Sequence, residues 1–169
     1  MSDDDEAYGI ERENAHPRAL QLIPDEFFWD CADELAPFGS DEGDTALDEF
    51  RGWRLKHPKS PIEECIAWTI ESVGEMDPTE YTDEIADEKL IASQLEDEDF
   101  DDQQYIYTLD VSVIATGFGQ LADEGTIDAS AKPYLRRALK RQMVWARLVK
   151  MDPGYERNLR RLEQVLDEA

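Results

Sequence analysis

The sequence has little of what metal, cofactor and secreted proteins commonly use. Two cysteines and two histidines in 169 residues are too few for a disulfide scaffold, and neither histidine stands in an HExxH or CxxC pattern. No GxxxxGK[ST], GxGxxG or GxSxG sequence occurs, so a phosphate loop or a serine nucleophile elbow is not indicated. No apolar run reaches 18 residues, so no membrane helix is expected. We therefore predict no cofactor, no metal ligands and no catalytic residues.

Positive charge is also scarce. Seventeen Lys and Arg against 41 Asp and Glu give a net charge of −24. Direct nucleic-acid binding is not expected, because contact with phosphates requires a basic surface. Four Trp, six Phe and six Tyr nevertheless provide material for a core, which argues against a wholly disordered chain.

The length and the composition predict one domain preceded by a tail. Residues 1–14 are charged and lack apolar periodicity, so they are expected to form a flexible acidic tail before a single helical domain over residues 15–169. The first six residues, MSDDDE, lack the basic and apolar segments of a secretory signal. This predicts a cytoplasmic protein with reduced thiols, and the apolar surroundings of Cys31 and Cys65 predict that both are buried.

Helix signals recur along the chain as capping residues, prolines in first turns and apolar residues spaced by three and four. They predict an all-α bundle of about six helices. The expected helices cover residues 24–35, 44–57, 61–74, 85–95, 128–150 and 155–166. The clearest signal is Ser60-Pro61-Ile62-Glu63, which reads as a capping box with proline at the first helical position, and Asp44 and Asp128 are the expected caps of two other helices.

Residues 105–113 fit two structures. Alternation of apolar and polar types favours a strand through Tyr105, Tyr107, Leu109, Val111 and Val113. A helical stripe also runs through Ile106, Leu109, Val113, Gly117 and Leu121. No second strand is evident for pairing, so we favour a helix, with an α+β fold as the alternative.

The charge is unevenly distributed. Residues 1–110 carry a net charge of −26, whereas residues 111–169 carry +2. Ten Lys and Arg lie within residues 132–161, and like charges such as Arg136 and Lys140 stand four residues apart on one expected helix. We expect the acidic part of the chain to pack beside this basic hairpin. The alternative is that an anion or a second subunit binds there and forms a homo-oligomer.

The most acidic segment is the candidate partner-binding site. Residues 75–102 hold 13 acidic residues and one basic residue, Lys89. A turn at its end carries the residues expected to bind a partner, with Phe100 as an apolar anchor: Asp97, Glu98, Asp99, Phe100, Asp101 and Asp102. The turn resembles the start of a calcium loop, but it lacks the glycine at position six and the glutamate at position twelve, so no calcium site is predicted.

Several short segments resemble one bacterial family. They are HPRA at 16–19, FFWDC at 27–31, APFGSDEGD at 36–44, VIATGFGQL at 113–121 and EGTID at 124–128. Together they resemble the YfeS-like group of uncharacterised bacterial proteins. The resemblance implies a bacterial cytoplasmic protein and a helix over residues 105–124. It supplies no functional residues.

Three functions remain open. The leading hypothesis is a non-enzymatic acidic protein that binds a basic protein, in the manner of an immunity or inhibitor protein against a toxin, with a DNA mimic as a variant. The alternative is a small enzyme or ligand-binding domain with a pocket in the turn between residues 29 and 44. Its walls would be Trp29 and Phe38, and its polar groups Asp30, Asp41 and Asp44. The third is a homo-oligomeric scaffold joined through residues 132–161.

Overall fold

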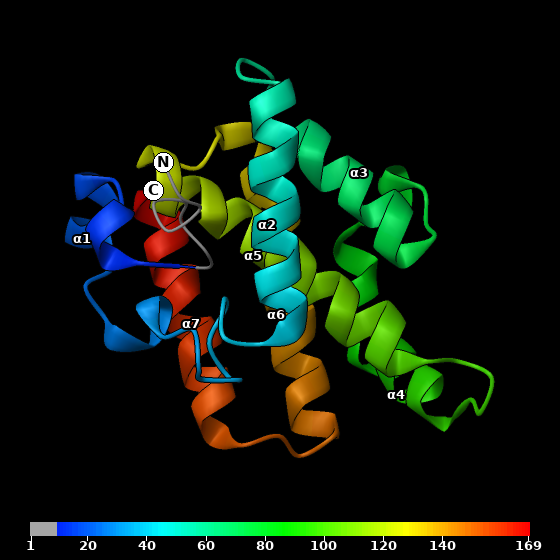
Figure 1. The fold of residues 1–169 in the computed structure, drawn as a ribbon. Helices are drawn as coiled ribbons and strands as arrows, with labels where there is room; N and C mark the ends of the chain where they lie inside the picture. Colours follow the sequence, from blue (N-terminus) through cyan, green and yellow to red (C-terminus); the bar gives the residue numbers. More distant parts are fainter. Residues whose placement is uncertain (1–9) are drawn as a thin grey trace.

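Seven α-helices, linked by 3-10 and π turns, make up residues 10–169, which are the residues that the computed structural model describes (Figure 1). No strand occurs in that part of the chain, which confirms the all-α prediction. The helices are α1 (Pro17–Leu22), α2 (Asp41–Lys56), α3 (Ile62–Gly74), α4 (Glu88–Glu96), α5 (Leu109–Glu124), α6 (Lys132–Leu148) and α7 (Pro153–Glu168). Within residues 10–169, none of these helices combines the length and apolar character needed to cross a membrane.

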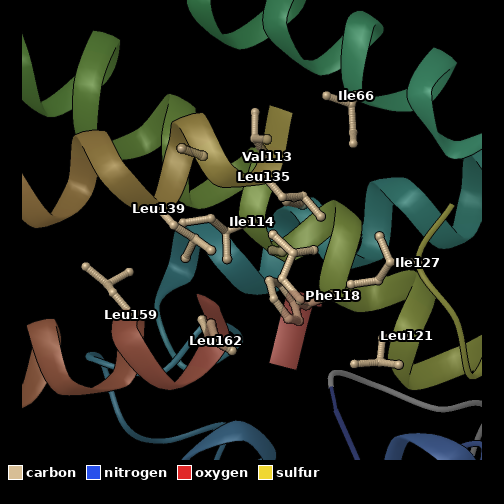
Figure 2. Packing of buried hydrophobic residues seen from close by; sticks show 14 of the residues in the cluster. Ile66, Val113, Ile114, Phe118, Leu121, Ile127, Leu135, Leu139, Leu159 and Leu162 are labelled. Atoms are coloured by element: carbon tan, nitrogen blue, oxygen red, sulfur yellow. The ribbon is translucent and has the colours of Figure 1, made fainter. Parts of the chain in front are cut away.

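Helix α5 is the centre of the fold, with α2, α3 and α6 packed around it (Figure 1). Its side chains are buried from Leu109 to Ala122, on all sides of the helix. Gly117 allows α6 to approach closely, because a Cβ at this position would lie 2.4 Å from Leu135 Cδ1. Figure 2 shows apolar side chains of α5, α6 and α7 meeting in this core, among them Ile114, Phe118, Leu139, Leu159 and Leu162.

The segment that was compatible with a strand is helical, so the α+β alternative is wrong. A π turn, Gln103–Thr108, continues directly into α5, and Ile106 and Leu109 of the predicted helical stripe are buried. Side chains of α6 donate to the carbonyl groups of this wide turn. Arg141 Nη2 lies 3.1 Å from the carbonyl oxygen of Tyr105, and Gln142 Nε2 lies 3.2 Å from that of Ile106. The helical form therefore satisfies backbone groups that an unpaired strand would leave without partners.

A buried polar network joins α5 to α6. Asp110 is fully buried, and Arg141, which is 2% exposed, donates to it from Nε and Nη2 at 2.8 Å each. Tyr81 Oη donates to Asp110 Oδ1 at 2.6 Å, and Gln142 Nε2 donates to Oδ2 at 3.0 Å. Burial raises the pKa of Tyr81 well above its ordinary value, and the negative charge of Asp110 raises it further. The phenol therefore keeps its proton and remains a hydrogen-bond donor. The buried charges are thus paired and hydrogen-bonded on both sides.

The predicted helix over residues 24–35 is wrong. Only Glu26–Trp29 forms a single 3-10 turn there. The side chains of Asp30 and Asp33 then accept from the backbone N–H groups of Ala32 and Leu35, at 2.8 and 2.9 Å. These local bonds compete with helical ones and divert the chain into turns.

Two helices are capped by residues other than those predicted. Ser40, not Asp44, caps α2, because Ser40 Oγ accepts from the Gly43 N–H at 3.1 Å. The expected capping box at Ser60 does not form; the Ile62 N–H at the start of α3 instead donates to Asp128 Oδ2 at 2.8 Å. Asp128 was expected to cap the helix that follows it, whereas α6 begins at Lys132 after a 3-10 turn and has no side-chain cap.

Part of the predicted tail, residues 1–9, lies outside the described residues. From the remainder, Ile10 packs into the core at 3% exposure, and Arg12–Asn14 forms a 3-10 turn. The cysteines differ from each other: Cys65 is buried as predicted, but Cys31 is exposed in the turn region after the 3-10 helix. Burial raises the pKa of the Cys65 thiol to about 12, which keeps it protonated and unreactive at neutral pH.

The Asp110–Arg141 pair should dominate the response of the core to mutation. Arg141→Met leaves the carboxylate of Asp110 buried without a cation, so we expect the free energy of unfolding to fall by about 3–5 kcal/mol. The double variant Asp110→Leu/Arg141→Met should be more stable than Arg141→Met, because it also removes the unpaired charge. Urea unfolding at pH 7 measures both. A loss below about 1 kcal/mol in Arg141→Met would contradict the assigned role.

Candidate functional site

The acidic segment, residues 75–102, covers one edge of the molecule, with α4 at the lower right of Figure 1. It contains two 3-10 turns, Pro78–Glu80 and Asp83–Ala86, followed by α4. Three buried side chains attach it to the core: Tyr81, Ile85 and Ile91. Apart from Leu90, its large apolar side chains turn inward, and the segment presents most of its carboxylates to solvent.

An acidic groove of about 640 Å³ lies between this segment and α6. Its lining residues are Asp83, Glu84, Ala86, Asp87, Glu88, Leu90 and Lys140. Leu90 is 40% exposed, so an apolar side chain stands among carboxylates. Asp83 is paired with Arg137 at 3.0 Å, and Asp87 caps α4 by accepting from the Leu90 N–H at 3.0 Å. Glu84 and Glu88 are exposed and make no ion pair with residues 10–169.

The residues predicted to bind a partner lie together in the turn after α4, but several of them hold that turn in place. Asp97 Oδ1 accepts from the Asp99 N–H at 2.9 Å, and Asp101 Oδ1 accepts from the Gln104 N–H at 3.2 Å. Asp102 Oδ2 accepts from the indole N–H of Trp145 at 2.9 Å.

The other three predicted residues divide into an anchor and two exposed carboxylates. Phe100 is half-buried against the core, with its ring 6.0 Å from that of Tyr105. Glu98 and Asp99 present their side chains to solvent. Phe100 therefore fixes the turn, and these two acidic residues are the part of it most open to a partner.

The alternative pocket residues are not gathered around one cavity. Trp29 and Phe38 belong to the core, where the Trp29 indole N–H donates to the carbonyl oxygen of Ile23 at 2.8 Å and both rings pack edge-on against Phe28. Asp30 and Asp44 are exposed, and Asp30 accepts within its own turn.

Asp41 lines a cleft that has a volume of about 310 Å³ and is also lined by Tyr107 and Trp145. Burial first, and then the negative charges of Glu42 and Glu34, raise the pKa of Tyr107. The cleft is therefore an acidic environment with an aromatic wall. Ligand binding there stays a prediction.

Six of the ten basic residues of the hairpin form ion pairs among residues 10–169. Acidic residues from the first two thirds of the sequence pair with it, as predicted: Asp25 with Arg161, Asp83 with Arg137, and Asp110 with Arg141. Other arginines pair inside the hairpin, namely Arg136 with Asp167 and both Arg147 and Arg160 with Glu156. The pairing offsets the like-charge repulsion along α6.

The carboxylates of residues 10–169 do not gather into a metal centre. Among residues 10–169, no group of three or more His, Cys, Asp or Glu side chains is placed to hold a metal ion. The acidic surface is thus a spread of separate charges. Such a surface acts on charged macromolecules through its summed field.

Mutation of a structural residue of the turn should lower the free energy of unfolding more than mutation of an exposed one. Asp102→Ala leaves the indole N–H of the buried Trp145 without its partner, so we expect a loss of about 1–3 kcal/mol in the free energy of unfolding. Asp99→Ala, at an exposed carboxylate three residues away, should change it by no more than about 0.5 kcal/mol. Chemical denaturation followed by tryptophan fluorescence compares the two. Equal effects would show that the Trp145 contact is not what Asp102 contributes.

No protein-family model matches the chain, and no solved structure matches it significantly. The chain is 29% identical over 165 residues to the uncharacterised protein YfeS of Escherichia coli (strain K12). The match covers 98% of this chain and 64% of YfeS, so the chain spans less than two thirds of that relative's length. The chain is thus similar to YfeS over nearly its whole length, in agreement with the resemblance of its short segments to the YfeS-like group.

Proposed function

We propose that this chain is a non-enzymatic acidic protein that binds a basic protein in the bacterial cytoplasm. An immunity or inhibitor protein against a basic toxin is the concrete form, and a DNA mimic is a variant of it. The observation that carries the proposal is the acidic groove, where exposed Glu84 and Glu88 flank the exposed side chain of Leu90.

The groove combines two properties that favour a protein ligand. Its carboxylates belong to a chain of net charge −24, which attracts a basic protein over long range and raises the association rate at low salt. Leu90 offers a central apolar contact surrounded by charge, an arrangement in which the apolar group contributes most of the affinity and the charged rim contributes orientation. The exposed carboxylates of Glu98 and Asp99 extend the acidic surface past the far end of α4.

The buried ionisable groups support a structural rather than a catalytic use. Asp110, Arg141 and Tyr81 bond to one another in the core. Their hydrogen bonds go to other groups of the same chain. This pairing accounts for their burial without a need for a substrate. Both cysteines are free thiols, which agrees with a reducing compartment.

The test uses the immobilised full chain and native bacterial lysate at about 50 mM salt, where charge attraction extends over more than 10 Å. We expect one basic protein to be captured stoichiometrically and released as the salt concentration rises. The groove variant is Glu84→Gln/Asp87→Asn/Glu88→Gln, and its matched control, with three exposed carboxylates changed elsewhere, is Glu26→Gln/Asp48→Asn/Glu163→Gln.

The groove variant should weaken the binding of the captured protein about tenfold or more, and the control should change it less than about threefold. Equal losses in the two triple variants would show attraction by net charge alone. Charge reversal at Glu98 and Asp99 tests the extension of the surface past α4. Failure to capture any basic protein would contradict the proposal as a whole.

The homo-oligomeric scaffold is tested separately. Six of the ten basic residues in 132–161 already form ion pairs among residues 10–169, so much of the positive charge of that face is compensated without a second copy. We expect light scattering to give the monomer mass, 19.4 kDa, at about 50 mM and about 500 mM salt. A stable dimer at both salt concentrations would favour the scaffold.

A further inference from the structure

A second groove lies between α2 and α3, on elements that do not contribute to the acidic groove. Both helices pack on α5, and they leave their connecting loop at an angle to each other (Figure 1). The groove between them has a volume of about 560 Å³. Its lining residues are Glu49, Gly52, Trp53, Lys56, His57 and Trp68.

Two tryptophans give the groove an apolar surface. Trp68 of α3 is 43% exposed, which is unusual for the largest apolar side chain. Trp53 of α2 is held in place, because its ring stacks on that of His57 with centroids 5.0 Å apart. The guanidinium of Arg54 also lies over Trp53, 5.2 Å from the ring centroid, and an ion pair with Glu124 holds it there. One wall is therefore rigid and the other is open to solvent.

Gly52 provides a floor that the chain itself does not use. A Cβ at this position would meet no atom within 4 Å, whereas a Cβ at Gly117 or Gly119 would lie 3.0 Å or less from a leucine side chain. Gly52 lies inside α2, where glycine weakens a helix relative to alanine. Packing within residues 10–169 does not require this glycine. Its absent side chain lets another molecule approach the helix backbone closely.

The charges around the groove indicate what kind of molecule this is. Glu64 and Glu71 are exposed about one turn before and after Trp68 on α3, and Glu49 lines the groove from α2. Lys56 is the basic residue among the lining groups. An apolar groove with a mainly acidic rim complements an amphipathic helix whose apolar side chains are flanked by Lys or Arg.

We propose that the α2/α3 groove binds an amphipathic helix of a partner protein. A large apolar side chain of that helix sits over Gly52 between Trp53 and Trp68, and its basic residues face Glu49, Glu64 and Glu71. The tryptophans supply the apolar contact and the glutamates set the orientation. The inference does not rest on the acidic groove beside α4, because the two surfaces share no lining residue.

The test uses a synthetic peptide as its probe, an 18-residue helix with leucines on one face and lysines on the other. A shuffled peptide of the same composition has no apolar face, and a leucine–glutamate peptide keeps that face with the opposite charge. At about 150 mM salt, which limits the reach of surface charge to about 8 Å, isothermal titration calorimetry should show micromolar binding of the first peptide. The other two peptides should bind at least tenfold more weakly.

Surface variants then locate the binding. Trp68→Ala should weaken it about tenfold or more, since it removes an aromatic anchor. Gly52→Gln should weaken it about fivefold or more by filling the floor, and Gly52→Ala, which adds only a Cβ there, should weaken it less than Gly52→Gln does. Leu55→Ala is the control, because Leu55 is 85% exposed on α2 and does not line the groove.

Three results would overturn the proposal. They are no binding of the leucine–lysine peptide, equal binding of the shuffled peptide, or equal effects of Trp68→Ala and Leu55→Ala. Far-UV circular dichroism of each variant confirms that the helices are retained, so a loss of binding reports on the groove. Glu84→Gln/Asp87→Asn/Glu88→Gln should keep groove binding within about threefold, which separates this result from the proposed function.

Discussion

The carboxylate of Asp110 is the group on which the arrangement of this fold most depends. A charge buried in the central helix must be compensated, and the compensating side chains come from two other parts of the chain. Arg141 and Gln142 bind it from α6, and Tyr81 binds it from the acidic segment. Tyr155 extends the network to α7 by donating to Gln142 Oε1 at 2.5 Å. One buried charge thus fixes the relative positions of four segments.

This network also connects the core to the surface. The acidic segment has few apolar residues and strong repulsion between its carboxylates, so it would not pack well by hydrophobic contact alone. Tyr81 anchors it at one end, and the bond between Asp102 and Trp145 fixes the other end to α6. The carboxylates between these points are displayed on a fixed frame. A partner would therefore meet an ordered surface, which lowers the entropy lost on binding.

Local sequence patterns predicted the helices that carry a clean apolar stripe. The stripes of α3 and α7 were identified, and the basic hairpin was expected beside acidic neighbours. The errors arose where distant contacts compete with local signals. Ser60 and Glu63 look like a capping pair, yet Asp128 takes the N–H of Ile62. Residues 24–35 look helical, yet aspartate side chains divert the backbone into turns.

The candidate surfaces were harder to predict than the fold. With 41 carboxylates, sequence spacing does not tell which ones cap helices and which face solvent, so Asp97 and Asp101 were selected although they bond within their turn. The acidic groove needs Lys140 of α6 beside α4, a tertiary contact without a local signal. Trp68 did leave a signal, because it lies outside the apolar stripe of α3 formed by Ile62, Ile66 and Ile70.

The cap of α3 links helix formation to the order of synthesis. Asp128 lies 66 residues after Ile62, whose N–H it accepts. At about 5–20 residues per second, a ribosome needs about 3–13 s to add that stretch, whereas an isolated helix relaxes within about a microsecond. The first turn of α3 must therefore remain without its final partner while α4 and α5 are made. The first turn of α3 is therefore completed only after Asp128 has been synthesised. The bond between Ile62 and Asp128 then closes a loop that contains the acidic segment and α5.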